Sequence, residues 1–190
     1  MWPWEHLAVG YLLYSGYVHI RGEESPSPAA AVAVAVGTQF PDLVDKPLAW
    51  TFGVLSSGVS VAHSVFVFVG LSTILLVLAR RLDIEAPGEG FVVGYLSHLP
   101  ADALYPALLG GGVTVEKLFW PLTAAPPAVQ SGFSDNFVYY FVRFLSFLAT
   151  ERGMFFLVLE VLLLAVTVLI WRSDGYPGLP AAVRPVPHSE

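Results

Sequence analysis

The chain contains no cysteine and few charged residues. Among its 190 residues, 13% are Asp, Glu, Lys or Arg, and only nine are Lys or Arg. The absence of cysteine excludes both a disulfide framework and a thiolate metal site, so any metal must be bound by His, Asp or Glu. The formal net charge of -6 argues against nucleic acid as a partner, because nucleic-acid-binding proteins need a basic surface.

Hydrophobic residues, in contrast, make up 55% of the chain. A soluble domain of this size is rarely so apolar. We therefore expect an integral protein of the cell membrane, with the lipid bilayer as its first partner.

The apolar stretches predict an all-α, polytopic helical membrane protein with about five transmembrane helices and one amphipathic helix. Dividing these stretches by the length that a bilayer requires gives spans at 4–20, 29–40, 62–79, 91–109 and 153–171. Polar residues spaced by three and four predict the amphipathic helix from residue 136 to about 150.

The chain has no evident internal repeat or second domain. We expect a single helical membrane domain over residues 1–172 and a Pro-rich, unstructured tail over residues 173–190. Between the second and third spans, Pro41 and Pro47 are expected to bracket a tight polar turn that contains Asp42 and Asp45.

Polar residues interrupt the apolar spans at one common depth. His98 and Asp102 are four residues apart and therefore share a helix face, although burying them in hydrocarbon is costly. Alternating the direction of the spans places six such groups on one side of the membrane: His6, Asp42, Asp45, His63, His98 and Asp102. Glu160 enters the last span to a similar depth from the same side.

A set of imidazoles and carboxylates is typical of a divalent metal site. These ligands suit zinc, and manganese or iron(II) as alternatives. Six groups are too many for one tetrahedral zinc and about right for two ions, so we predict one or two ions. The metal would acidify a bound water to a pKa of ~7 and so supply a hydroxide nucleophile. A carboxylate, Asp45 or Asp102, is the candidate catalytic base.

The order of these residues resembles the YdjM-type family of membrane-bound metal-dependent hydrolases. The resemblance covers residues 1–121 and rests on these motifs: His6, Pro41-Asp42-x-x-Asp45, His63-Ser64, Gly94-Tyr95-Leu96-Ser97-His98-x-x-x-Asp102 and Trp120-Pro121. That family is distantly similar to zinc-dependent phospholipase C, which implies a phosphoester substrate. Its members typically carry an arginine shortly before the His-Ser pair, whereas residues 58–62 contain no basic residue here, and Arg143 is the available replacement.

Three functions are compatible with these residues. The first is a metal-dependent hydrolase that acts on a lipid or lipid-linked phosphoester. The second is a non-catalytic membrane scaffold or interaction protein in which the same cluster is a structural metal site or a polar staple between helices. The third is a proton- or ion-coupled carrier built on Asp102 and Glu160, which five spans without a repeat make the least favoured.

Overall fold

The computed structural model describes residues 1–125, 127 and 132–180. The described residues contain six α-helices and one short 3₁₀-helix, and no strand, so the all-α prediction is confirmed. The elements in chain order are α1 (Pro3–Ile20), α2 (Pro28–Trp50), α3 (Val65–Arg81), α4 (Glu85–Leu108), η1 (Glu116–Phe119), α5 (Phe133–Leu148) and α6 (Glu151–Ser173).

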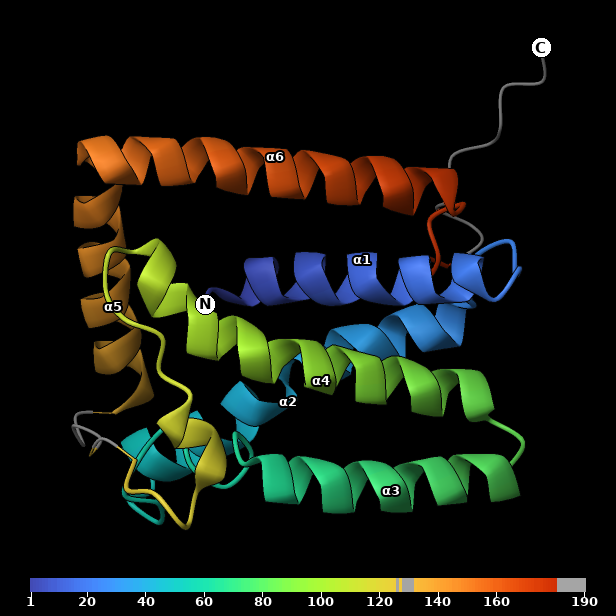
Figure 1. Ribbon diagram of the computed structural model, residues 1–190, viewed down its shortest axis with the longest axis horizontal. Helices are drawn as coiled ribbons and strands as arrows, with labels where there is room; N and C mark the ends of the chain where they lie inside the picture. Colours follow the sequence, from blue (N-terminus) through green and yellow to red (C-terminus); the bar gives the residue numbers. More distant parts are fainter. Residues whose placement is uncertain (126, 128–131, 181–190) are drawn as a thin grey trace.

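Five of the helices lie side by side, and α5 crosses them at one end (Figure 1). At that end lie the start of α1, the end of α2, the start of α3, the end of α4 and the start of α6. The alternation that the sequence predicts therefore brings the polar ends of these helices together beside α5.

Helices α2 and α4 form the closest pair, because glycines face each other's backbones across their contact. A Cβ atom on Gly94 would lie 2.5 Å from the carbonyl oxygen of Val34, and one on Gly90 would lie 2.7 Å from that of Ala30. Gly90 and Gly94 are separated by three residues, which is the small-residue spacing that lets membrane helices pack closely. This contact holds the N-terminal half of α2 against α4.

Helix α2 differs from the predicted polar turn. It continues to Trp50 through Pro41 and Pro47, so Asp42 and Asp45 lie on a helix. Proline fixes a φ angle that a helix accepts and removes only one backbone hydrogen bond, a loss that packed neighbouring helices can offset. As a result the two carboxylates stand on one helix, three residues apart, instead of at the corners of a turn.

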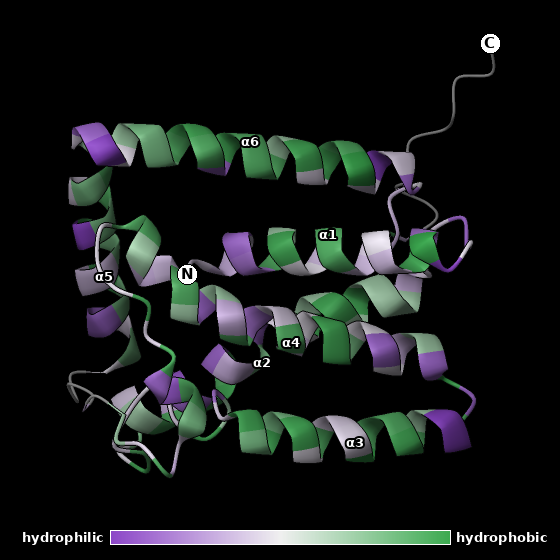
Figure 2. Ribbon diagram, in the orientation of Figure 1, coloured by the Kyte–Doolittle hydropathy of each residue, from purple (hydrophilic) through white to green (hydrophobic). Residues whose placement is uncertain are grey.

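One helix of the described residues, α6, is long and apolar enough to cross a membrane by length and composition. Only 17% of its most apolar window is buried inside the protein, and Figure 2 shows hydrophobic residues along most of its length. Helix α3 is also largely apolar but has 17 residues, fewer than the ~20 of a full span. The five-span arrangement therefore stays a prediction.

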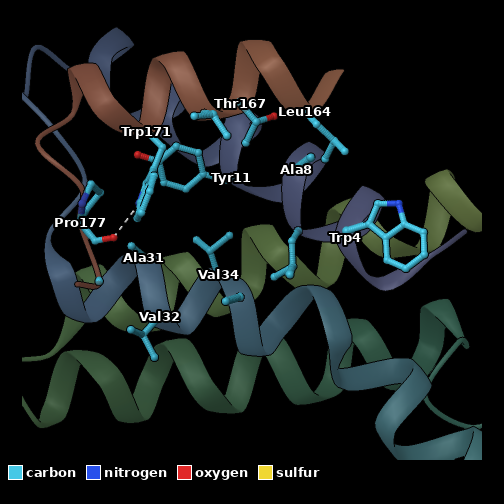
Figure 3. A pocket seen from close by; sticks show the side chains of 14 residues that line it. Trp4, Ala8, Tyr11, Ala31, Val32, Val34, Leu164, Thr167, Trp171 and Pro177 are labelled. Atoms are coloured by element: carbon cyan, nitrogen blue, oxygen red, sulfur yellow. Dashed lines mark hydrogen bonds between the residues drawn. The ribbon is translucent and has the colours of Figure 1, made fainter. Parts of the chain in front are cut away.

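The segment that follows α6 packs against α1, although we expected the tail from residue 173 to be unstructured. The buried Asp174 carboxylate accepts hydrogen bonds from the hydroxyl groups of Tyr11 (2.5 Å) and Ser15 (2.7 Å). The Trp171 indole donates to the carbonyl oxygen of Pro177 at the end of an apolar groove between α1, α2 and α6 (Figure 3). Residues 181–190 of the predicted tail lie outside the described residues.

The close α2–α4 contact predicts that adding one methyl group at Gly94 destabilises the protein. Gly94→Ala places a Cβ against the Val34 carbonyl oxygen, and overpacking of this kind costs about 1–3 kcal/mol. We expect a matching decrease in the free energy of unfolding, measured by thermal and denaturant unfolding in detergent. Gly70→Ala on α3 is the control, because nothing lies within 4 Å of its added Cβ. Equal stability of the two variants would contradict this account of the contact.

Candidate metal centre

Four side chains from three segments meet at the end of the bundle beside α5. Asp42 comes from α2, His63 from the loop before α3, and His98 and Asp102 from α4. All four are buried, and each offers one ligand atom within 4.8 Å of the others. We call these residues the four-residue cluster.

Five of the six separations between the ligand atoms of the cluster are close to those around a tetrahedral metal ion. His63 Nε2 lies 3.2 Å from His98 Nε2, 3.4 Å from Asp42 Oδ1 and 3.5 Å from Asp102 Oδ2. His98 Nε2 lies 3.6 Å from Asp102 Oδ2 and 3.8 Å from Asp42 Oδ1. Four ligands bonded to zinc at ~2.0–2.1 Å are separated by roughly 3.3 Å, so the cluster fits a metal ion of this size with small adjustments.

The orientation of the two imidazoles also suits a metal. The Nδ1 atom of His63 lies 2.8 Å from Asp45 Oδ2, and that of His98 lies 2.7 Å from the carbonyl oxygen of Thr38. Both oxygens only accept hydrogen bonds, so each Nδ1 carries a proton and each Nε2 can present a lone pair to the cluster. Metal-ligating histidines are held by hydrogen bonds of this kind.

The cluster needs a positive charge at its centre. Burial lowers the pKa of His63, but the nearby carboxylates of Asp102, Asp42 and Asp45 outweigh this effect and raise that pKa to about 10. A proton on His63 therefore balances the carboxylates unless a metal ion displaces it, and metal binding of this type releases protons. The Oδ1 atom of Asp42 is buried without a hydrogen-bond partner, so this oxygen is available as a ligand for the metal ion.

Asp45 lies behind His63 and outside the four-residue cluster. Our sequence analysis predicted this residue as a metal ligand and catalytic base, and its position differs from that prediction. Its carboxylate is fully buried and accepts hydrogen bonds from the backbone N–H groups of Ser60 (2.7 Å) and Ala62 (3.0 Å) as well as from His63. These contacts occupy both oxygens. Asp45 is therefore a positioning residue that fixes the loop before α3 and the ring of His63.

His6 lies at the edge of the four-residue cluster. Its Nε2 atom is 3.2 Å from Asp102 Oδ1, without hydrogen-bond geometry, and its ring stacks on that of His98. Glu160 on α6 lies beside the start of α1, where one of its carboxylate oxygens accepts a hydrogen bond from the Trp4 indole.

A cavity of about 740 Å³ lies against the carboxylate side of the cluster. Asp42 and Asp102 line it, as do the basic side chains of Lys46 and Arg143. Its aromatic lining comes mostly from α5 and includes Trp50, Tyr105, Phe133, Phe137, Tyr140, Phe144 and Phe147. The cavity therefore joins a polar, metal-ligating end to an apolar interior.

Lys46 is the basic residue that our sequence analysis missed. Its Nζ atom lies 2.5 Å from Asp42 Oδ2 and its ammonium group lies over the Trp50 ring. Lys46 also lies beside the loop in which the family's arginine is missing, because a Cβ on Gly58 would be 3.5 Å from Lys46 Cγ. The spacing of four between Asp42 and Lys46 would have indicated this pair if the segment had been assigned to a helix.

The position of Asp45 predicts that replacing it weakens metal binding strongly, although no metal ligand is lost. Asp45→Asn removes the charge that orients His63, and changes to such supporting partners typically cost 10–100-fold in metal affinity. We expect a decrease of that size, measured by competition of the purified protein with a chelating dye. Asp83→Asn, in the exposed turn between α3 and α4, is the control. Unchanged affinity of the Asp45 variant would contradict the positioning role.

Comparison with known proteins supports the resemblance seen in the motifs. A family model described as YdjM inner membrane protein matches residues 1–175, which include all six helices and the four-residue cluster. Searches of curated proteins and of solved structures found no match. The chain belongs to the YdjM inner membrane protein family.

Proposed function

We propose that this protein is a membrane-embedded, metal-dependent hydrolase that acts on a lipid or lipid-linked phosphoester. The observation that carries the proposal is a buried, closely spaced His/Asp cluster beside a cavity lined by basic and aromatic side chains. Zinc suits two imidazoles and two carboxylates at these separations best, and manganese or iron(II) are alternatives. Such an ion supplies an acidified water and polarises a phosphoryl oxygen.

Asp42 is the residue that we assign to proton transfer. It lines the cavity, and its buried Oδ1 atom has no hydrogen-bond partner, while Lys46 pairs with its other oxygen. His63, His98 and Asp102 can hold the ion as three protein ligands, which is the number that catalytic zinc sites use. Asp42 is then free to accept the proton of the attacking water as general base.

The cavity favours an amphiphilic substrate with an anionic head group. Lys46 and Arg143 provide positive charge in the cavity lining, and guanidinium groups bind phosphate oxygens in pairs. The aromatic side chains of α5 offer a surface for an apolar chain. Such a substrate would enter from the bilayer with its phosphoester bond toward the cluster.

We also propose that α1, α2, α3 and α4 cross the membrane together with α6. The five helices lie side by side (Figure 1), and large apolar side chains of α3, including Phe66, Val69 and Ile74, are exposed. Exposed apolar side chains on every turn of a helix are favourable against lipid and unfavourable in water. In this arrangement the four-residue cluster lies close to one face of the membrane, and α5 lies across that face.

A structural metal site is the second candidate function. Four protein ligands at tetrahedral separations are typical of closed structural zinc sites, and all four members of the cluster are close enough to bind one ion. In that case the ion would tie α2, the loop before α3 and α4 together, and the protein would serve as a scaffold or interaction partner.

Asp42→Asn separates the two candidates. If Asp42 is the general base, we expect the variant to retain zinc and to lose about 10²–10⁴-fold in kcat. The measurements are zinc content by mass spectrometry and hydrolysis of bis-p-nitrophenyl phosphate and of phosphatidylglycerol in mixed micelles, with Asp83→Asn as control. Wild-type protein that binds zinc but shows no hydrolysis sensitive to chelation would support the structural site and overturn the hydrolase.

The position of Arg143 in the cavity lining predicts that this residue contributes to substrate binding. Arg143→Gln removes a positive charge from the cavity but leaves the cluster intact. We expect KM for anionic phospholipid to rise by about tenfold, a loss of roughly 1.4 kcal/mol in binding, with little change in kcat. Arg81→Gln, at the far end of α3, is the control for general charge effects. An unchanged KM would exclude Arg143 from head-group binding.

A further inference from the structure

The backbone carbonyl group of Asp102 accepts a hydrogen bond from a lysine side chain. In a regular helix this oxygen accepts from the residue four positions later, but that residue is Pro106, which has no N–H group. The Nζ atom of Lys117, in η1, lies 2.8 Å from the Asp102 carbonyl oxygen and takes the place of the missing donor. A lysine 15 residues later in the chain therefore completes the hydrogen bonding of the helix turn that carries a candidate metal ligand.

Two further hydrogen bonds hold Lys117 in this position. Before it in the chain, the Thr114 backbone N–H donates to the carbonyl oxygen of Ala103 on α4 (2.9 Å). After it, the carbonyl oxygen of Trp120 accepts a hydrogen bond from the Ser64 hydroxyl group (2.7 Å), which comes from the loop before α3. These contacts fix the segment on both sides of Lys117. They also give a role to Ser64 and Trp120, two residues of the sequence motifs that lie outside the four-residue cluster.

The charge of Lys117 also suits this place. Lys117 is half-buried, and burial of an ammonium group costs free energy unless hydrogen bonds or charges compensate for it. A charged donor makes a hydrogen bond roughly twice as strong as a neutral donor does. The four-residue cluster contributes the carboxylates of Asp42 and Asp102, which attract a nearby cation. A lysine therefore fixes the Asp102 backbone more firmly than a neutral side chain would.

The position of the Asp102 backbone determines where its carboxylate lies. The Oδ2 atom lies 3.5 Å from His63 Nε2 and 3.6 Å from His98 Nε2, and a metal site needs its ligands within about 0.5 Å of the productive geometry. Because the Asp side chain is short, a displacement of the helix turn moves this oxygen by a similar distance. Such a displacement is easiest where Pro106 has removed a helical hydrogen bond.

We propose that Lys117 is a positioning residue of the metal centre, which acts through the Asp102 carbonyl group that Pro106 leaves without a helical donor. The proposal rests on the metal centre proposed above and adds a residue that supports it. Lys117 lies outside the four-residue cluster and outside the cavity lining, so its effect on the bound ion is indirect. It holds the backbone of one ligand and leaves the substrate side of the site unchanged.

The test is a double-mutant cycle in which Pro106→Ala restores the missing backbone donor. Lys117→Met removes the ammonium group, and we expect it to lower the affinity for Zn²⁺ about tenfold, as the loss of supporting partners typically does. In the Pro106→Ala background the new N–H group serves the Asp102 carbonyl, so the same substitution should leave the affinity close to that of wild-type protein. Lys117→Arg keeps a cationic donor and should retain the wild-type affinity. Glu116→Gln, an exposed neighbour in η1, is the matched control.

Two measurements distinguish positioning from a purely structural role. Zn²⁺ affinity is measured by competition with a chelating dye, and the ligand geometry is followed by the visible absorption bands of bound Co²⁺. Lys117→Met should change both. A lower melting temperature with unchanged Zn²⁺ affinity and an unchanged Co²⁺ spectrum would overturn the positioning role. If Lys117→Met does not fold, the double variant with Pro106→Ala decides, because it should fold and bind Zn²⁺, and its failure to bind would overturn the proposal.

The outcomes also separate this proposal from the metal centre on which it rests. Wild-type protein and Lys117→Met that bind Zn²⁺ equally would overturn the role of Lys117 and leave the four-residue cluster intact. A loss in Lys117→Met that persists undiminished in the Pro106→Ala background would overturn the action through the Asp102 carbonyl group. Failure of wild-type protein to bind Zn²⁺ or Co²⁺ would overturn both proposals.

Discussion

The structure depends on the burial of two imidazoles and two carboxylates within one small volume at the end of an apolar helix bundle. Uncompensated charge in such a place costs several kcal/mol per ion, and polar side chains inside membrane segments persist only where they have partners. The opposed Nε2 atoms of His63 and His98, 3.2 Å apart, require a proton or a metal ion between them. The packing around the cluster follows from this requirement.

Helix packing and hydrogen bonds hold these groups close to one another. Gly90 and Gly94 let α4 approach α2 until their backbones touch, which brings Asp42 to the face that carries His98 and Asp102. Asp45 then reaches the loop before α3 and holds His63 through a network of backbone hydrogen bonds. A family of inner membrane proteins that binds a metal in this way would combine a rigid site with a cavity open to amphiphilic molecules, since α5 supplies an aromatic wall instead of further ligands.

The gathering of polar groups at one end of the bundle follows from two patterns in the sequence. The i, i+4 spacing of His98 and Asp102 and the alternation of helix direction place six polar groups at one end of the bundle, as Figure 1 shows for the helices that carry them. Helix ends are less predictable: Pro41 and Pro47 indicate a turn, but tertiary packing against α4 keeps α2 helical to Trp50.

The role of each side chain could not be predicted from the sequence. Whether a buried carboxylate binds a metal or supports a histidine depends on where its oxygens point, and the oxygens of Asp45 point at a loop 15 residues later in the chain. Lys46 was missed for a related reason, because its pairing with Asp42 requires a helix where the prolines predict a turn. The family model also matches more of the chain than the motifs cover, because it extends to residue 175 and the motifs end at residue 121.

The most direct test of the account is X-ray absorption at the zinc edge of wild-type protein purified without chelators. The account predicts bound zinc with nitrogen and oxygen neighbours at about 2.0–2.1 Å and the outer-shell scattering of at least two imidazoles, which His98→Ala should reduce. Protein without stoichiometric zinc, manganese or iron, or a metal surrounded by water alone, would contradict it.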